Sequence, residues 1–224
     1  MGLRERKKQR TRLLIAETAR TLFAERGFEV VSVAEIARAA EVSEATVFNY
    51  FPTKEDLVYQ GMEAFEEALL QAIKQRPPGE PAIEAFGRFV LEPRGFLAAK
   101  DEGSTRALLQ VSRMIAASPA LLTREHQILA RYTDSLAELL AQETGAGPSD
   151  LRPKMVAASL IGLHGALIGL VRSRIAEHAP DVRRLAREVR AEGERALDLL
   201  RQGLDGYAIE RPHGNMRSSG KRPR

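Results

Sequence analysis

Apolar residues recur three and four positions apart along almost the whole chain, and no segment shows a sustained alternation of apolar and polar residues. The first spacing places side chains on one face of an α-helix, whereas alternation would place them on one face of a β-strand. The 224-residue chain is therefore expected to be all-α, with about nine helices.

Hydroxyl residues that can cap helices follow one another closely near the N-terminus. Ser32, Ser43 and Thr53 each precede a short helical pattern,. Pro52 prevents the second of these helices from continuing,. A supporting helix, a tight turn and a short second helix are the parts of a helix-turn-helix, which we expect at residues 32–51.

Basic residues gather at both ends of the chain. The net charge of +4 favours an anionic partner only weakly, but the N-terminal arm holds six cations: Arg4, Arg6, Lys7, Lys8, Arg10 and Arg12,. The simplest interpretation of this arm is a solvated tail before a first helix at about Gln9–Arg26. Next to a DNA-binding head, it could instead neutralise several phosphates. Residues 211–224 are polar and basic, and we expect them to be disordered,.

Several classes of protein are disfavoured. The chain has no cysteine, which excludes disulfides and thiolate metal sites,. No secretory leader is visible, so a cytoplasmic, nucleoid-associated bacterial protein is expected. The apolar run from Met155 to Val171 is shorter than the roughly 20 residues of a membrane span and suggests a buried core helix,. No catalytic motif, metal-ligand spacing or phosphate-binding glycine loop occurs, so neither catalysis nor a cofactor is predicted.

Residues 16–58 resemble the N-terminal domain of the tetracycline-repressor (TetR) family. The resemblance covers about the first quarter of the chain and rests on several spaced elements together. These are Ala19-x-x-Leu22-Phe23, Gly27-Phe28, Ser32-Val33-x-x-Ile36-Ala37, Val42-Ser43, Thr46, Tyr50-Phe51 and Lys54-Glu55-x-Leu57. Two positions depart from the family pattern: Glu41 stands where the turn usually has glycine, and Phe48 replaces a tyrosine of the second helix.

The resemblance implies a DNA-binding transcriptional regulator, most often a repressor that a ligand releases from a palindromic operator. It also implies a body that forms a homodimer through its last two helices and holds a small-molecule pocket. The expected domains are the arm and DNA-binding head at 1–54, the ligand-binding and dimerisation body at 55–210, and the tail at 211–224. A constitutive architectural DNA-binding protein without an effector is the alternative. It would have a filled core in the body, whereas a regulator would have a cavity.

Eight residues are predicted to contact double-stranded DNA. Phosphate contacts are expected from hydroxyl and ammonium groups, and base contacts from the exposed side of the second short helix, where asparagine can pair with adenine and threonine can touch a thymine methyl. The residues are Ser32, Ser43, Glu44, Ala45, Thr46, Asn49, Tyr50 and Lys54. Simple capping is an alternative role for Ser32, and a favourable position near the helix dipole is one for Glu44.

A small-molecule effector, apolar or amphipathic, is expected to bind between the middle helices. The predicted contacts are Phe86, Phe89, Arg113, Met114, Tyr132 and His164, with Phe96 as a further candidate, although each could be ordinary core. Residues 108–122 resemble the equivalent segment of regulators that bind acyl-coenzyme A, for which Arg113 would contact an anionic group. A continuous helix from Lys54 to Gln75 is expected to connect this pocket with the DNA-binding head.

The dimer interface is expected on the last two helices. Gly162, Gly165 and Gly169 lie within a strongly helical run, where each glycine costs about 1 kcal/mol relative to alanine,. Such a stripe allows another helix to approach closely, and Leu197 and Leu200 of the last helix follow a matching spacing. Two copies of this helix pair would form a four-helix interface. Packing within one chain is the alternative explanation.

Overall fold

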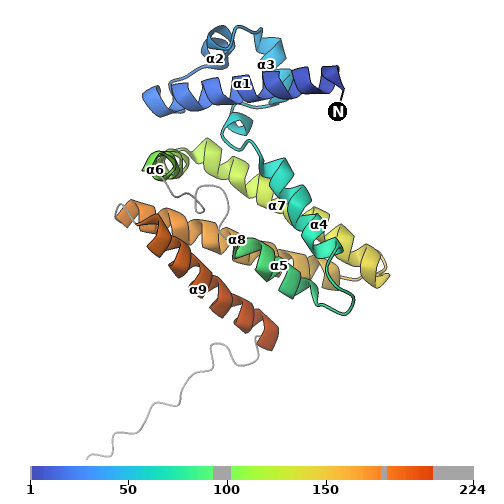
Figure 1. Ribbon diagram of the computed structural model, residues 1–224. Coiled ribbons are helices and arrows are strands. Elements are labelled where there is room, and N and C mark those ends of the chain that lie inside the picture. Colours follow the sequence, from blue (N-terminus) through green and yellow to red (C-terminus); the bar gives the residue numbers. More distant parts are fainter. Residues whose placement is uncertain (1, 93–101, 178–180, 204–224) are drawn as a thin grey trace, which may run out of the picture.

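The computed structural model describes residues 2–92, 102–177 and 181–203, which form nine α-helices and one 3₁₀ turn without any β-strand (Figure 1). The all-α expectation is thus confirmed for the described part. The helices are α1 (Leu3–Arg26), α2 (Val33–Ala39), α3 (Glu44–Tyr50), α4 (Met62–Lys74), α5 (Ala82–Val90), α6 (Glu102–Ala117), α7 (Pro119–Thr144), α8 (Arg152–Glu177) and α9 (Val182–Gln202), with the turn η1 at Glu55–Leu57. The predicted disordered tail and Phe96 lie outside the described residues.

Helices α1 to α3 form a head at one end of the molecule (Figure 1). Ile15 and Ile36 are fully buried, and Val47 and Phe51 are 1% exposed, so the three helices share one apolar core. Helix α2 begins with a capping box, in which the Ser32 side chain accepts from the Glu35 N–H and the Glu35 carboxylate accepts from the Ser32 N–H,. The three-helix head predicted from the spacing of caps therefore has a physical basis in both caps and core.

The turn between α2 and α3 contains Glu41 in the left-handed region, at a φ of 55°. It is the one non-glycine residue with positive φ in the described part of the chain. A glycine would take this conformation without strain, whereas a side chain costs roughly 1–2 kcal/mol. The backbone thus keeps the geometry of a glycine turn even though the residue is glutamate.

Helix α1 is longer than the sequence predicted. It begins at Leu3 instead of Gln9, so the basic arm is exposed to solvent as expected, but it is part of a helix and not a tail before it. Lysine, arginine, glutamine and glutamate are all good helix formers, and no glycine or proline interrupts residues 3–26,. The arm shows no apolar periodicity because residues 4–10 are exposed. Periodicity reports burial, so it could not find this part of the helix.

The long helix predicted from Lys54 to Gln75 is also wrong, because the structure divides it. Thr53 and Asp56 exchange the expected capping hydrogen bonds, but they cap only the single turn η1. The chain then turns at Gly61, whose φ of 87° is left-handed, and α4 begins at the next residue. We call residues 53–61 the neck, since they join the head to the body (Figure 1).

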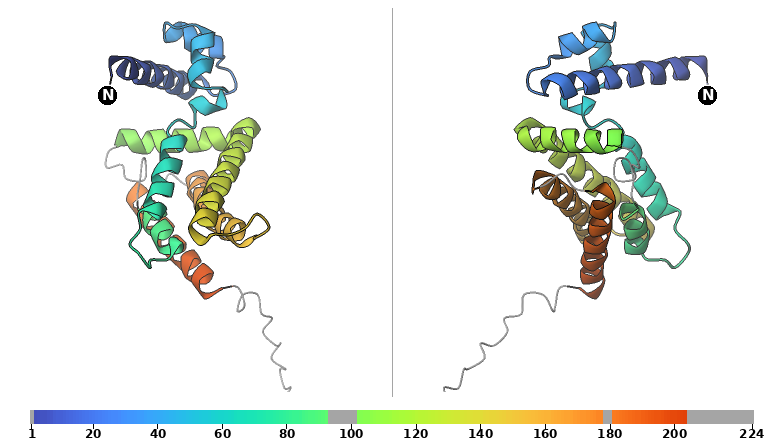
Figure 2. Two further views of the ribbon diagram at one scale, coloured as in Figure 1. Left: turned by 90° about the vertical axis from the view of Figure 1, so that its right-hand side faces the viewer. Right: turned by 60° about the vertical axis from the view of Figure 1, so that its left-hand side comes forward.

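Helices α4 to α9 form the body, in which α8 contacts α5, α6, α7 and α9 (Figure 2). Its length and composition would suffice for a membrane span, but it packs as one of several helices in a bundle. Only 28% of the residues in its most apolar window are buried, so the expected core helix is covered on one side only. The exposed residues of this helix include the large apolar side chains of Met155 and Val156.

Candidate nucleic-acid interface and effector site

Helix α3 presents most of the predicted base-contacting residues to solvent. Val47 is 1% exposed and holds the helix against the head, while Glu44, Ala45 and Asn49 are exposed on the other side. Phe48 is also 46% exposed, although it is a large apolar residue. A short helix anchored on one side and free on the other can enter a major groove.

The cap residues of the head are already engaged in local hydrogen bonds. The Ser43 hydroxyl lies 2.8 Å from the Thr46 hydroxyl and accepts from the Thr46 N–H at 3.1 Å. Glu35 also forms an ion pair with Arg26 at 2.8 Å. Its hydrogen bonds with Ser32, together with this ion pair, lower the pKa of Glu35 to about 2. The capping role considered for Ser32 is therefore present, and its exposed hydroxyl remains at the surface.

Tyr50 and Lys54 lie at the end of α3 and the start of the neck. Tyr50 is half-buried. The Lys54 ammonium is 4.3 Å from the centre of the Phe28 ring and 3.5 Å from the carbonyl oxygen of Glu29. These contacts hold the ammonium against the head, so a DNA phosphate would have to share it with Phe28 and the carbonyl.

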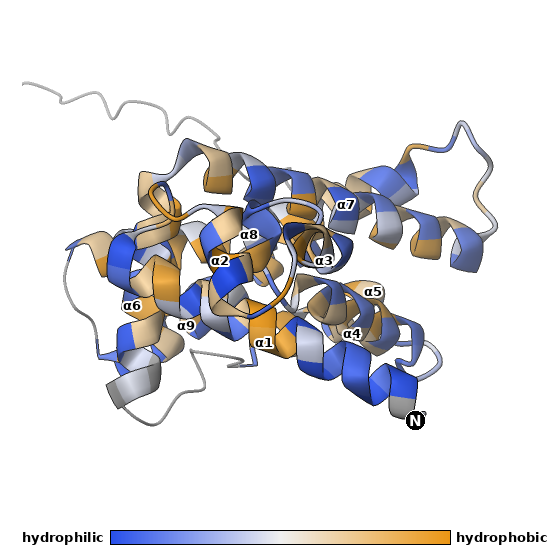
Figure 3. Cartoon of the chain, turned by 90° about the horizontal axis from the view of Figure 1, so that it is seen from above, coloured by the Kyte–Doolittle hydropathy of each residue, from blue (hydrophilic) through white to orange (hydrophobic). Residues whose placement is uncertain are grey.

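The N-terminal turns of α1 are hydrophilic and extend beyond α2 and α3, as the view from above shows (Figure 3). Residues 4–10 are exposed, and their cations are Arg4, Arg6, Lys7, Lys8 and Arg10. Helical structure fixes the direction of these cations relative to α3. An array of fixed positive charges next to a groove-binding helix is suited to the DNA backbone.

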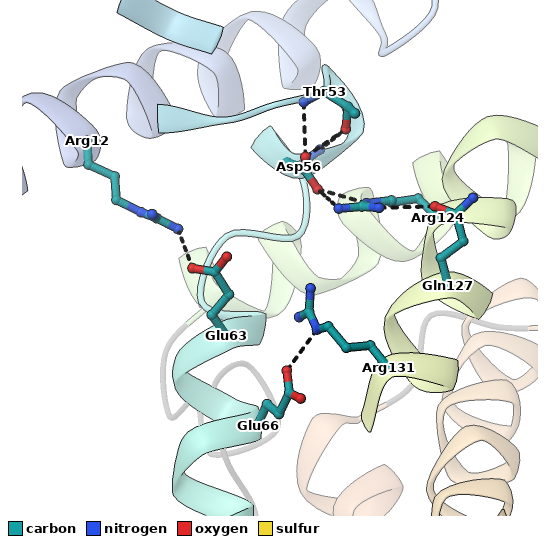
Figure 4. A network of polar contacts seen from close by, with 8 residues as sticks. All are labelled: Arg12, Thr53, Asp56, Glu63, Glu66, Arg124, Gln127 and Arg131. Atoms are coloured by element: carbon teal, nitrogen blue, oxygen red, sulfur yellow. Dashed lines mark hydrogen bonds and ion pairs between the residues drawn. The ribbon is translucent and has the colours of Figure 1, made fainter. Parts of the chain in front are cut away.

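A polar network crosses the neck and joins head to body (Figure 4). The Asp56 carboxylate accepts from Thr53 and also from Arg124 of α7, with a shortest distance of 2.6 Å. On the head side, Arg12 of α1 contacts Glu63 of α4 at 3.4 Å. Sequence reasoning missed these pairs because the partners are far apart in the chain, 68 residues for Asp56 and Arg124.

Three further hydrogen bonds connect the head or the neck with α6 and with the start of α7. The Tyr59 hydroxyl donates to the Leu121 carbonyl at 2.8 Å, and burial raises the pKa of Tyr59, so the donor stays protonated. Ser118 donates to Glu29 at 2.5 Å, and the Gln110 amide donates to the Ala24 carbonyl at 2.6 Å. The position of the head is thus determined by α6 and α7 as well as by the neck.

Four of the six predicted effector contacts lie in the buried part of the body. Phe86 is fully buried, Tyr132 is 1% exposed, and Phe89 packs edge-on against Phe65 at 5.4 Å. Phe65 also stacks on His164, with ring centres 5.2 Å apart, and on Tyr132 at 6.0 Å. We call the four rings in these contacts, Phe65, Phe89, Tyr132 and His164, the aromatic cluster; Phe86 lies on the same helix as Phe89.

His164 is the member of this cluster that has a buried ring nitrogen without a hydrogen bond. Its Nδ1 has no hydrogen-bond partner within the described residues. Burial disfavours the imidazolium and lowers the pKa of His164 to about 4, so the ring is neutral at pH 7,. A buried polar atom without a partner is costly, and a bound molecule could satisfy it. Tyr132 differs, because its hydroxyl donates to the Met62 carbonyl at 2.6 Å.

The other two predicted contacts lie elsewhere. Arg113 is exposed on α6, and Met114 lines a cavity between α6 and α1. Neighbours in sequence point to different sides of a helix, so a set chosen from one segment separates in space. Phe65 of α4 belongs to the cluster although it is not among the predicted effector contacts, because helical spacing does not distinguish it from an ordinary core residue,.

The predicted dimer residues also divide into two groups. No atom of the described residues lies within 4 Å of where a Cβ would stand at Gly162 or Gly169, and both are exposed. At Gly165 a Cβ would come 3.3 Å from Leu129 of α7, so this glycine faces its own chain. Gly162 and Leu200 line an apolar groove of about 480 Å³ between α8 and α9, which we call the α8–α9 groove.

Leu197 packs within one chain, as the alternative explanation had it. It is 2% exposed, and its side chain comes within 2.6 Å of where a Cβ would stand at Gly87 of α5. Gly193 similarly leaves room for Leu91, which a Cβ would approach to 2.2 Å. These two glycines allow α9 to lie closely against α5. Like Gly162, both are glycines inside a helix. The sequence therefore could not show which glycines accommodate a side chain of the same chain and which leave an open surface.

Comparison with known families gives two separate matches. Residues 15–60 match the profile described as "Bacterial regulatory proteins, tetR family", and residues 80–205 match that of the "MftR C-terminal domain". The second match alone covers more than half of the chain. The first match contains the helix-turn-helix, and the second contains the aromatic cluster residues of α5, α7 and α8 together with the α8–α9 groove.

Individual proteins are similar over most of the chain. The transcriptional regulator TcmR of Streptomyces glaucescens is 32% identical over 160 residues, which are 70% of this chain and 71% of TcmR. The putative mycofactocin biosynthesis regulator MftR of Mycobacterium tuberculosis is 26% identical over 66% of this chain and 73% of its own. The structure of the fatty acid degradation regulator FadR from Bacillus halodurans superposes with a TM-score of 0.53 at 22% identity. That alignment covers 82% of this chain and 96% of FadR, and it shows the same fold.

Proposed function

This chain belongs to the tetR family of bacterial regulatory proteins and is a DNA-binding transcriptional regulator, and we propose that it is a repressor released from its operator by a small molecule. Regulators of this family bind operator DNA, usually as dimers. We further propose that two copies bind a palindromic operator, because a homodimer places its two heads on successive major grooves, about 34–36 Å apart.

The observation that carries this proposal is the exposed side of α3. Glu44, Ala45 and Asn49 are exposed on a helix that is capped by Ser43 and anchored by Val47. Exposed side chains of a rigid, short helix can contact base edges without rearrangement. We assign base contacts to these residues and to Thr46. We assign phosphate contacts to Ser32, Ser43, Tyr50 and Lys54.

Replacing Asn49 tests this assignment. An asparagine that pairs with adenine contributes about 1–3 kcal/mol of discrimination, so Asn49→Ala should weaken operator binding roughly 5- to 150-fold and relax the base preference at one position. Binding is measured by fluorescence anisotropy on duplexes selected from a random library. Gln142→Ala, an exposed amide on α7, serves as the matched control. Equal affinity of Asn49→Ala and the control for the selected duplex would contradict the assignment.

For the effector, we propose an apolar or amphipathic molecule that binds in the aromatic cluster. Its apolar part would lie against Phe86, Phe89 and Tyr132, and a hydrogen-bond donor would meet Nδ1 of His164,. An acyl chain satisfies the apolar requirement, whereas Arg113 is exposed on α6 outside the aromatic cluster and would meet an anionic headgroup only if that headgroup extended to the surface. The effector must bind the arrangement that releases DNA more tightly than the arrangement that holds it.

A screen of apolar small molecules against the protein–operator complex tests this release. A true effector should weaken operator binding of the natural protein and have a smaller effect on His164→Leu, which lacks the buried nitrogen. If no compound that binds the body changes operator affinity, the alternative of an architectural DNA-binding protein without an effector is supported instead.

A further inference from the structure

A cavity of about 390 Å³ lies between the head and the body, where α6 passes beneath the C-terminal half of α1 (Figure 2). Its walls come from three separate parts of the chain. Phe23 and Ala24 belong to α1, Leu57 to the neck, and Ala107, Val111 and Met114 to α6. We call it the joint cavity. It is distinct from the aromatic cluster, none of whose residues contributes to its lining.

The lining chemistry restricts what can occupy the joint cavity. The walls named above are apolar, while Gln60 and Gln110 provide amide groups. Arg20 and Glu25 also contribute to the lining and carry opposite charges, and Arg20 is further paired with Glu17. An occupant with a net charge would therefore gain little and lose hydration. A neutral, mostly apolar molecule with one hydrogen-bonding group matches this lining.

The size and position of the cavity also suit a ligand. Binding pockets for small molecules typically measure about 300–1,000 Å³ and occur preferentially at interfaces between domains. Several of its lining residues, such as Arg20, Ala24 and Gln110, are exposed, so the cavity opens to solvent and a ligand can enter it. Larger side chains at Ala24 and Ala107 would fill much of this space, so its presence is not forced by the fold.

We propose that the joint cavity is a second ligand site, which takes a neutral, largely apolar small molecule and couples its binding to that of operator DNA. The occupant touches α1 of the head and α6 of the body at the same time. It therefore binds best to one arrangement of the two parts, and any change in that arrangement on DNA must alter its affinity. The coupling rests on the proposed regulatory function, whereas the site itself does not.

The neutral dye N-phenyl-1-naphthylamine, which becomes fluorescent when it leaves water, is a suitable probe for the full chain. Ala107→Phe should fill the cavity and raise the dye dissociation constant about tenfold or more. Ala116→Phe makes the same change at an exposed position of the same helix and should leave the constant unchanged. Val111→Met adds less volume and replaces Ala107→Phe if circular dichroism shows that variant to be unfolded. Dye binding that is absent, or equal in the filling and control variants, overturns the proposal.

Two further measurements separate this site from the proposed function. Dye bound in the joint cavity should survive His164→Leu, so loss of binding in that variant and not in Ala107→Phe would remove the joint site and leave the effector proposal standing. Saturating operator DNA should shift the dye constant by the same factor by which the dye shifts operator affinity. If the chain binds no operator but the cavity-filling pattern holds, the site stands and the regulatory function fails. Operator binding that leaves the dye constant unchanged overturns the coupling.

Discussion

At the scale of single residues, Glu41 carries the clearest backbone strain in the head. Its φ of 55° would suit glycine. Glu41→Gly should remove roughly 1–2 kcal/mol of strain but add unfolded-state entropy, for a net gain of about 0.5–1 kcal/mol in the free energy of unfolding. Urea denaturation measures this gain. Glu138→Gly, at an exposed position inside α7, should lose about 1 kcal/mol instead,. A loss of stability in Glu41→Gly would show that the turn is not strained.

His164 should make the stability of the body depend on pH. Its folded-state pKa of about 4 lies below the ordinary 6.5, so between these values the unfolded chain binds more protons than the folded one,. The contribution is fully present above pH 6.5 and is lost as the pH falls towards 4. From pH 7 to pH 5 the loss is about 2 kcal/mol.

Denaturant titrations of the natural protein and of His164→Leu at pH 7 and pH 5 test this dependence. Other acidic groups titrate in both proteins, so the difference between the two pH responses isolates His164. The variant should lose less stability than the natural protein on acidification. Identical losses would mean that the imidazole is solvated or finds a partner in the folded state.

Among single residues, the caps and the exposed base-contacting set of α3 could be predicted from sequence, because hydroxyl caps and helical spacing are local signals. The strain at Glu41 could not be predicted, because a glutamate at the glycine position of the turn suggests a backbone conformation that non-glycine residues accept, whereas its φ is 55°,. Contacts such as Lys54 on Phe28 could not be predicted, since a ring 26 positions earlier in the chain leaves no local pattern. The contact roles of these residues with DNA remain predictions that the Asn49 experiment addresses.

At the scale of elements, the first two turns of α1 hold cations in fixed directions and should contribute to DNA binding without regard to sequence. Deleting residues 1–8 should weaken binding to all duplexes similarly and reduce the log–log salt slope by about 0.9 for each phosphate that the arm no longer neutralises. Affinity measured from low to moderate salt gives this slope. Lys7→Gln/Lys8→Gln, which keeps the helix, should show part of the effect. A changed base preference with unchanged affinity would argue against this role.

The two elements that sequence reasoning misjudged show where periodicity fails. Helix α1 begins early because its charged turns form a helix without burying any face. The helix predicted from Lys54 to Gln75 is interrupted at the neck because Gly61 takes a left-handed conformation. The apolar spacing of Leu57, Met62 and Phe65 nevertheless continues across this interruption. Spacing records which face is buried, but it does not record a change in helix direction.

At the scale of the whole molecule, the uncovered side of α8 indicates where a second copy would pack. The α8–α9 groove, together with exposed Met155 and Val156, leaves a large apolar surface on the single chain,. Gly162→Leu should fit the single chain, since its Cβ meets open space, but should prevent close approach of a partner. Sedimentation velocity should then show a monomer where the natural protein is a dimer, and operator affinity should fall.

Gly147→Leu is the matched control, because it makes the same change in the loop before α8, also into open space. It should leave the sedimentation coefficient of the dimer unchanged. A natural protein that sediments only as a monomer at micromolar concentration would remove the dimer from the proposed function. The division into head and body was accessible from sequence. Which glycines face α5 or α7 and which face open space could not be predicted from sequence, because this depends on how the helices assemble.

The shortness of the neck has a consequence for how the protein would leave DNA. If the head rotates about the neck, a one-turn connection followed by a left-handed glycine, the centre of rotation lies nearer to Tyr50 and Lys54 at the end of α3 than to the N-terminal end of α1 (Figure 1). A small rotation there moves the distal cations of α1 through a larger arc than the end of α3. The cations would therefore leave the outer phosphates before α3 leaves the groove, and dissociation would proceed from the flanks of the operator inward.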